Sequence, residues 1–306
     1  TCFLAAGPSV AQTTFASITG TITDPTGTSI PNARVEATHV ESGYRYATQS
    51  NETGIYTLAQ LRDGAYTLRV QAAGFKEFVA QDIVLVSLEG RRIDVRLEIG
   101  AVESRIEVTA GAAMIETESA RISDIRSDEV LKAMPRNSRN VSAFLGLTAG
   151  VLAYTSGERR FAGSHPNQSE ATIDGITSSN MNSTSSSTVI GPLTNFIESY
   201  QEIRIDMANN TAEFGTIGQV TVVTKAGTNT FHGTLFDYYS TPWFRARNPF
   251  SPERGTGITH NPGFTAGAPV HLPHIYNGRN RTFWYYSFET TRGSQRTQLM
   301  QPTVPL

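Results

Sequence analysis

The chain contains almost no cysteine, since Cys2 is the only one among 306 residues. A disulfide needs two thiols, and a Cys-based metal site needs several, so the sequence excludes both within this chain. Charged residues are also scarce, at 17%, and the net charge of −2 predicts no basic surface for nucleic acid. No run of about 18 apolar residues occurs, and we therefore expect no membrane-spanning helix.

The motifs of common enzymes are missing from the sequence as well. It contains no Gly-x-Ser-x-Gly sequence and no Gly-rich phosphate-binding loop. His271 and His274 are close together, but Pro273 lies between them without a nearby carboxylate, so we interpret HLPH as a loop and not as a metal site. Asp174 precedes Gly175, a pair typical of turns. The sequence therefore predicts a protein that is not an enzyme and that uses no cofactor and no metal.

Residues 1–11 are typical of the end of a secretory signal peptide. Residues 3–6 are apolar, and Ser9 and Ala11 are small residues at the −3 and −1 positions of a cleavage site. We predict cleavage near Ala11 and a mature protein that begins near Gln12. The alternative is a buried or disordered N-terminal segment.

Residues 12–100 predict a seven-stranded β-sandwich. Turn sequences separate the runs at residues 24–27 (DPTG), 51–54 (NETG) and 62–64 (RDG). The seven alternating runs are SITGTIT, ARVEATHV, YRYATQ, GIYTLAQL, GAYTLRVQAAGF, DIVLVSL and RIDVRLEI. This number of short strands at close spacing is typical of a sandwich with its own core.

The pattern changes after Gly100. Residues 101–110 predict a linker, and residues 111–228 predict a small α/β domain. Its first helix covers residues 128–133, with Ser127 as N-cap and Pro135 as the stop, and a second begins near Asn140. Its strands are EATIDGI, QEIRID and QVTVVTK, and residues 177–188 form a polar loop.

Aromatic residues concentrate in the last predicted domain, residues 229–306. Of the 28 aromatic residues, 14 lie between Phe231 and Phe288, including both tryptophans. Trp284, Tyr286 and Phe288 alternate with more polar side chains, as expected of a transmembrane β-barrel strand, although a two-faced soluble strand shows the same alternation. Between FHGTLFDYY and RTFWYYSFETTR, we expect a long surface loop over residues 242–280.

In this order, the motifs resemble the Oar-like TonB-dependent outer-membrane receptors, which carry a carboxypeptidase-regulatory-like domain before their plug. The resemblance covers nearly the whole mature chain. It rests on ITGTITDPTGTSIPNARVEAT and TGIYTLAQLRDGAYTLRVQAAGF, on MPRNSRNVSAFLGLTAGV, ATIDGI, AEFG and VTVVTKAGTNTFHG, and on FRARNPF and RTFWYYSFETTRG. Two positions depart from the family: DMANN replaces the Arg-Gly-Pro that many plugs carry, and residues 137–140 read NSRN in place of NGRN.

The resemblance implies a mainly β protein, with a sandwich, a plug and the first strands of a 22-stranded barrel. Because two strands cannot close a barrel, we expect an N-terminal fragment of a longer receptor. The implied location is the outer membrane, in contact with its lipid. The implied partners are the TonB energy-transducing complex (TonB, ExbB and ExbD) and an unidentified extracellular ligand, which could be a glycan, a peptide or a chelate. The alternative is a secreted or surface adhesive protein whose sandwich binds carbohydrate or peptide without transport.

Three groups of residues are candidates for function. The segment Glu103, Ser104, Arg105, Ile106, Glu107, Val108 and Thr109 lies where these receptors keep the TonB box, and an extended segment can add to a partner's sheet. It could equally form the last strand of the sandwich or the first of the plug. Thr177, Ser178, Ser179, Asn180 and Asn182 could bind substrate, or form a solvated loop. Glu202 and Arg204 resemble plug charges that contact the barrel wall, or they form a surface pair.

Overall fold

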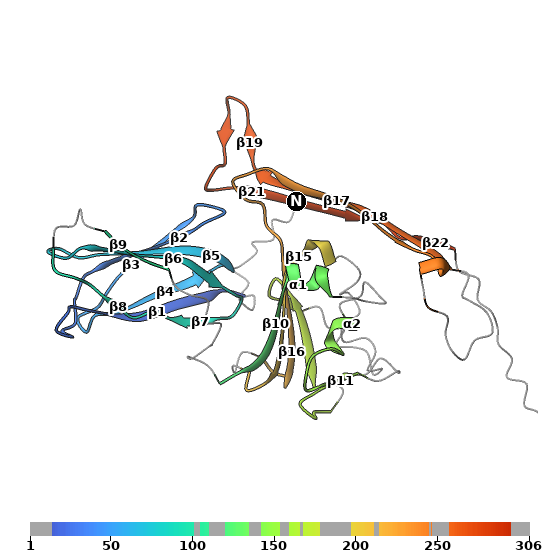
Figure 1. Ribbon diagram of the computed structural model, residues 1–306, viewed down its shortest axis with the longest axis horizontal. Coiled ribbons are helices and arrows are strands. Elements are labelled where there is room, and N and C mark those ends of the chain that lie inside the picture. Colours follow the sequence, from blue (N-terminus) through green and yellow to red (C-terminus); the bar gives the residue numbers. More distant parts are fainter. Residues whose placement is uncertain are drawn as a thin grey trace, which may run out of the picture.

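The computed structural model describes residues 14–100, 105–109, 120–134, 142–153, 159–165, 168–177, 197–210, 214–244, 246 and 257–294. The protein is mainly β, as predicted, and its elements form three units that follow one another along the chain. In Figure 1 the sandwich lies at the left, the middle unit lies beside it, and a long flat sheet extends above the middle unit. No helix within these ranges is long and apolar enough to cross a membrane.

The sandwich contains more strands than the seven predicted. One sheet has the order β3-β2-β5-β6-β9, and the other has β4-β1-β7, with β8 also pairing with β1. The strands are β1 (Ala16–Thr23), β2 (Arg34–His39), β3 (Arg45–Gln49), β4 (Ile55–Leu61), β5 (Gly64–Gln71), β6 (Glu77–Leu85), β7 (Gly90–Arg92), β8 (Val95–Arg96) and β9 (Arg105–Thr109). The run RIDVRLEI is divided because the carboxylate of Asp94 accepts hydrogen bonds from the N–H and hydroxyl of Thr21. This interaction separates β7 from β8, and β9 adds a strand beyond Gly100.

The alternating residues of these strands form one closed core. Its buried residues include Ile18, Tyr56, Leu68 and Ile83, all of which are at most 1% exposed. The predicted turns hold the strands in place: Asp24 Oδ1 accepts the N–H groups of Thr26 and Thr28, and Asn51 Oδ1 accepts those of Thr53 and Ile55. Such side-chain acceptors replace backbone partners that the chain loses at a turn.

The middle unit is a five-stranded sheet in the order β10-β15-β16-β13-β14, with short helices against it. Its elements are β10 (Ile122–Ser127), α1 (Asp128–Ala133), α2 (Ser142–Leu145), β11 (Val151–Ala153), β12 (Arg159–Phe161), β13 (Ser169–Ile173), β14 (Ile176–Thr177), η1 (Ile197–Ser199), β15 (Tyr200–Ala208) and β16 (Gly218–Thr224). The bounds predicted for α1 are confirmed, although the side chain of Ser127 makes no capping hydrogen bond. β10 was not predicted and lies at the edge of the sheet.

Strand β15 has two different faces. Ile203, Ile205 and Met207 belong to the core of the middle unit, together with Leu131, Phe144 and Val222 on neighbouring elements. Glu202, Arg204 and Asp206 alternate with these residues and therefore lie on the opposite face of the sheet. All three are nevertheless buried, so another part of the protein must cover them.

The third unit is an open sheet of long strands in the order β17-β18-β21, with β22 also pairing with β18. Its elements are β17 (His232–Ser240), η2 (Pro242–Phe244), β18 (Ile258–Pro269), β19 (His271–Leu272), β20 (Tyr276–Asn277), β21 (Phe283–Glu289) and β22 (Arg292–Ser294). The prediction of a loop throughout residues 242–280 is wrong, because β18 lies inside it and is the central strand. Its sequence, ITHNPGFTAGAP, is rich in the prolines and glycines that strands usually avoid.

Candidate functional site

The turn between β6 and β7 covers the polar face of β15. The Ser87 N–H donates to Glu202 Oε1 over 2.8 Å, and the Ser87 hydroxyl donates to the same oxygen. Nη1 of Arg204 donates to the Ser87 carbonyl over 2.9 Å. Leu88 has a φ of 59°, a left-handed backbone that residues with a β-carbon rarely adopt, and this bends the turn at the contact. We call Ser87, Glu202 and Arg204 the Ser87 junction.

Burial controls the electrostatics of the Ser87 junction. Arg204 is fully buried, and its Nε donates to Asp206 Oδ1 over 2.9 Å. Desolvation raises the pKa of Glu202 to about 7, although the hydrogen bonds from Ser87 act in the opposite direction. The junction therefore contains a buried guanidinium that is paired with Asp206, and a carboxyl group, that of Glu202, whose pKa lies near neutral pH.

The predicted positions of Glu202 and Arg204 are corrected by these contacts. The sequence placed both against a barrel wall, or as a surface pair, whereas both are buried against the sandwich. The reason is that their face of β15 is the one that the β6–β7 turn covers. No local sequence pattern indicates this contact, because Ser87 lies 115 residues before Glu202.

Glu198 joins the middle unit to the long sheet. Its side chain is 3% exposed and accepts the hydroxyl of Tyr238 on β17. Its carbonyl accepts the hydroxyl of Tyr285 on β21 over 3.2 Å and the ammonium of Lys225 over 3.0 Å. We call Glu198, Tyr238 and Tyr285 the Glu198 junction. Among the described residues it makes the contact with the long sheet that was predicted for Glu202 and Arg204.

Paired charges surround the Glu198 junction. Asp128 Oδ2 lies 2.9 Å from the ammonium groups of both Lys132 and Lys225, and Lys132 lies 3.6 Å from Glu198 Oε2. Burial lowers the pKa of Lys225. Burial also acts to lower the pKa of Lys132, but the neighbouring Asp128 carboxylate outweighs this effect, and the pKa of Lys132 is raised. Two acids and two bases thus neutralise each other where the middle unit meets β17 and β21.

The long sheet has the apolar outer face that the sequence predicts. Trp284, Tyr286 and Phe288 are exposed on one face of β21. Leu235, which is 87% exposed, is the register partner of Phe264, and Phe264 is the partner of Phe288. A contiguous row of this kind has no protein covering it among the described residues, and such rows face lipid or another protein.

Glycines on the inner face of β18 make room for large rings. A β-carbon on Gly263 would lie 2.3 Å from the ring of Phe236. One on Gly267 would lie 2.9 Å from the imidazole of His232 and 3.2 Å from the ring of Tyr285. These close approaches explain why a glycine-rich sequence occupies the centre of the sheet.

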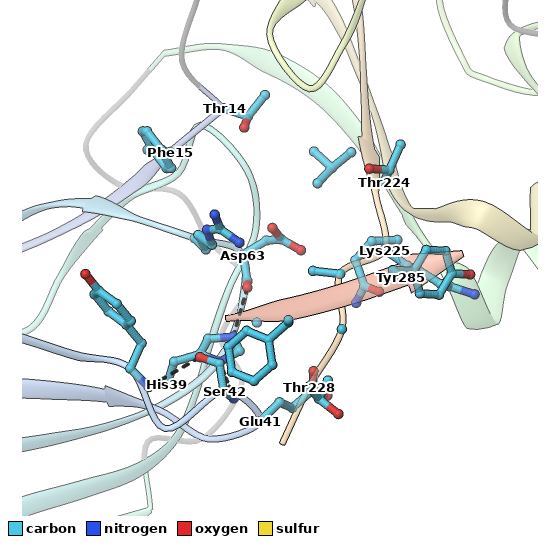
Figure 2. A pocket seen from close by; sticks show the side chains of 18 of the residues that line it. Thr14, Phe15, His39, Glu41, Ser42, Asp63, Thr224, Lys225, Thr228 and Tyr285 are labelled. Carbon is cyan, nitrogen blue, oxygen red and sulfur yellow. Dashed lines mark hydrogen bonds between the residues drawn. The ribbon is translucent and has the colours of Figure 1, made fainter. Parts of the chain in front are cut away.

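A cleft of about 1060 Å3 opens where the three units meet. Figure 2 shows His39, Ser42 and Asp63 on the sandwich side, with Lys225 and Tyr285 across from them. The Nδ1 atom of His39 accepts the N–H of Ser42 over 3.1 Å, so its proton lies on Nε2, which is 3.2 Å from the Asp63 carbonyl. His39 therefore orders a hairpin of the sandwich at this cleft.

That hairpin also touches the start of the long sheet. The Glu41 carbonyl accepts the N–H of Asn229 over 3.1 Å. Asn229 and Asn280 exchange two hydrogen bonds, of 2.7 and 2.9 Å, and a β-carbon on Gly43 would collide with Asn280. The sandwich thus contacts both other units.

The segment predicted as a TonB box is divided between described and undescribed residues. Glu103 and Ser104 lie outside the described residues. Residues Arg105–Thr109 form β9, which pairs in parallel with β6 at the edge of the sandwich. This is the alternative in which the segment forms the last strand of the sandwich, and its pairing with TonB stays a prediction.

The predicted substrate loop begins at a described hairpin. Asp174 has a φ of 49° and, with Gly175, forms the turn between β13 and β14, as predicted. Both Asp174 carboxylate oxygens accept hydrogen bonds from Thr224. The hydroxyl of Thr177 donates to Glu170 over 2.7 Å. Ser178, Ser179, Asn180 and Asn182 lie outside the described residues, as do residues 1–13 with the predicted signal peptide.

Metal-binding groups do not gather in the part of the chain that the structure describes: it contains no cluster of three or more His, Cys, Asp or Glu side chains placed to hold an ion. His271 lies on β19, and His274 lies in the turn before β20 with a φ of 63°.

Comparison with known proteins identifies both ends of the chain. Residues 17–98 match the carboxypeptidase regulatory-like domain, and residues 223–306 match an outer membrane β-barrel domain. The TonB-dependent transporter Oar of Myxococcus xanthus is 26% identical over 235 residues. Together these matches support a TonB-dependent receptor-like protein.

The match to Oar covers 71% of this receptor-like chain and 22% of Oar, so the chain spans about a fifth of that relative's length. The siderophore receptor PirA from Acinetobacter baumannii is 20% identical, covering 48% of this chain and 22% of PirA with a TM-score of 0.38. Catechol 1,2-dioxygenase from Acinetobacter sp. ADP1 is 14% identical, covering 33% of this chain and 60% of the dioxygenase with a TM-score of 0.25. Neither structural similarity is close enough to support an argument about function. The family is one of outer-membrane receptors and transporters, which are not typically enzymes.

Proposed function

We propose that this chain is the N-terminal part of a ligand-gated transporter that TonB energises at the outer membrane. Residues 12–100 are its sandwich, residues 111–228 its plug, and residues 229–306 the beginning of its barrel. The row of Leu235, Phe264 and Phe288 carries the proposal, because an exposed apolar row across β17, β18 and β21, with a more polar face opposite, suits a lipid-facing wall.

The Glu198 junction supports the assignment of a plug. It connects the middle unit to the inner face of the long sheet through the hydroxyl groups of Tyr238 and Tyr285, and such hydrogen bonds can separate and re-form more readily than an apolar core. In the proposed mechanism an extracellular ligand binds, and the TonB complex (TonB, ExbB and ExbD) pulls on the segment of residues 103–109. The plug then moves and opens a path for a glycan, a peptide or a chelate.

The adhesive alternative makes no use of the apolar row, because a secreted protein would expose it to water. We assign the chain no enzyme activity, because the proposed receptor family is not typically enzymatic. Thr177, Ser178, Ser179, Asn180 and Asn182 are proposed to touch the ligand, since the segment starts at the end of the β13–β14 hairpin of the plug.

The test is the response of the plug in the full-length receptor to energy and to TonB. A cysteine at Thr177 is labelled with a thiol-reactive fluorophore in cells that have TonB, that lack it, or that carry a proton uncoupler. We expect labelling to change only in energised cells with TonB, because plug movement requires both. Equal labelling in all three conditions, with the receptor present in the outer membrane, would contradict the proposal.

A further inference from the structure

The β6 edge of the sandwich holds a strand that lies beyond the sandwich proper. β9 pairs in parallel with β6 over five residue pairs, from Glu77 with Arg105 to Gln81 with Thr109. In the sheet order β3-β2-β5-β6-β9, removal of β9 would make β6 the edge strand. The backbone N–H and C=O groups on that side of β6 would then be unpaired, and an unpaired edge accepts other extended segments.

The match to the carboxypeptidase regulatory-like domain ends before β9 begins. That match covers residues 17–98, and the core residues whose side chains the structure describes already extend from Ala16 to Leu97. A parallel pair is also somewhat less stable per residue than an antiparallel one, and this pair is only five residues long. β9 is therefore an addition that can leave while the sandwich stays folded.

The register nevertheless fits the segment to this edge. Ile106 is the partner of Phe78, which packs against the core, and Val108 is the partner of Ala80, which belongs to it. Apolar positions of the segment thus coincide with core positions of β6. A slip by one residue would lose this match, so the pairing specifies one register.

We infer that the β6 edge of the sandwich stores residues 105–109 and competes with TonB for them. This inference rests on the proposed TonB coupling. Strand addition uses the same backbone groups in either sheet, so the segment is exchanged between β6 and the TonB sheet. The affinity that TonB shows is reduced in proportion to the fraction of receptors in which β9 is released. The sandwich thereby limits the binding of this segment to TonB.

A reversible lock between β6 and β9 tests the inference. Gln81→Cys and Thr109→Cys are introduced together into the full-length receptor in a Cys2→Ser background. These register partners are in neighbouring strands about 4.8 Å apart, a separation that a disulfide spans. The matched control joins Arg34→Cys to Gln49→Cys, exposed register partners at the opposite edge of the same sheet. A photo-cross-linking residue at position 105 reports contact with TonB.

We expect oxidation of the β6–β9 lock to reduce the TonB cross-link by at least about tenfold, since a locked segment has almost no released fraction. Reduction should restore it, and the control disulfide should leave it unchanged. Full cross-linking by the oxidised lock would mean that TonB adds to the outer edge of β9, and would overturn the competition.

Hydrogen exchange in the wild-type receptor tests storage without TonB. Within residues 105–109, the alternate amides that point to β6 should be protected, and oxidation of the lock should increase that protection. Unprotected amides would overturn storage. Failure of the proposed function looks different: the reduced and wild-type receptors would not cross-link to TonB, whatever the amide protection. Competition with TonB would then be refuted together with the proposed function.

Discussion

Replacement of Arg204 by methionine should detach the sandwich from the middle unit. Arg204 is fully buried and donates to the Ser87 carbonyl and to Asp206, and Asp206 is itself 1% exposed. Methionine fills similar space but supplies neither charge nor donor. The Asp206 carboxylate then stays buried without its cation, and its Oδ2 atom already has no hydrogen-bond partner in the described part of the chain.

The expected cost is about 3–5 kcal/mol, which is typical when one partner of a buried ion pair is removed. At about 1.4 kcal/mol for each factor of ten, opening of the Ser87 junction becomes roughly 100 to several thousand times more frequent. The Ser87 amide, which donates to Glu202, reports this opening by hydrogen exchange in the purified full-length receptor. Arg204→Lys should have an intermediate effect, because lysine keeps the charge but loses the planar fork.

Arg69→Met is the matched control, because Arg69 is an exposed residue of the sandwich whose replacement should change stability by less than about 0.5 kcal/mol. If the Ser87 amide exchanges at the same rate in both variants, Arg204 does not hold the sandwich, and the reasoning about the Ser87 junction is wrong.

Three further predictions concern pH, lipid and energy coupling. Because burial raises the pKa of Glu202 from 4.5 to about 7, its contribution to docking is complete below about pH 4.5 and is lost as pH rises through about 7. Exchange at Ser87, corrected for the intrinsic rate, should therefore increase between pH 5 and 8, and Glu202→Gln should abolish that dependence. Phe288→Arg on the apolar face should lower the free energy of unfolding by about 2–4 kcal/mol when the receptor is unfolded with urea in lipid vesicles. Ser287→Arg on the other face should lower it clearly less, and equal losses would contradict the assignment of the faces. Ile106→Pro removes a backbone N–H and should abolish TonB cross-linking, together with the energy-dependent change in labelling at position 177, at normal receptor abundance. Ile106→Ala should have a mild effect, and normal coupling in the Pro variant would remove the segment from the mechanism.

Local pattern was sufficient for most individual elements. Asp24 and Asn51 predict turns because their side chains satisfy nearby amides, which is a property of a few adjacent residues. The two faces of β21 follow from period-two alternation in the same way. β18 escaped prediction because its glycines are explained only by the rings of Phe236 and Tyr285, which come from other strands.

The sequence by itself determined the succession of a sandwich, a mixed unit and aromatic strands, because periodicity and turn chemistry act over short distances. The tertiary structure alone decided which polar residues meet. Glu202 and Arg204 contact Ser87, which is 115 and 117 residues away in the sequence. Glu198 contacts Tyr238 and Tyr285, which are 40 and 87 residues away. The position of β9 beside β6 is of the same kind, since an extended segment of five residues can pair with any open edge. Which edge it takes depends on where the folded sandwich leaves one unpaired.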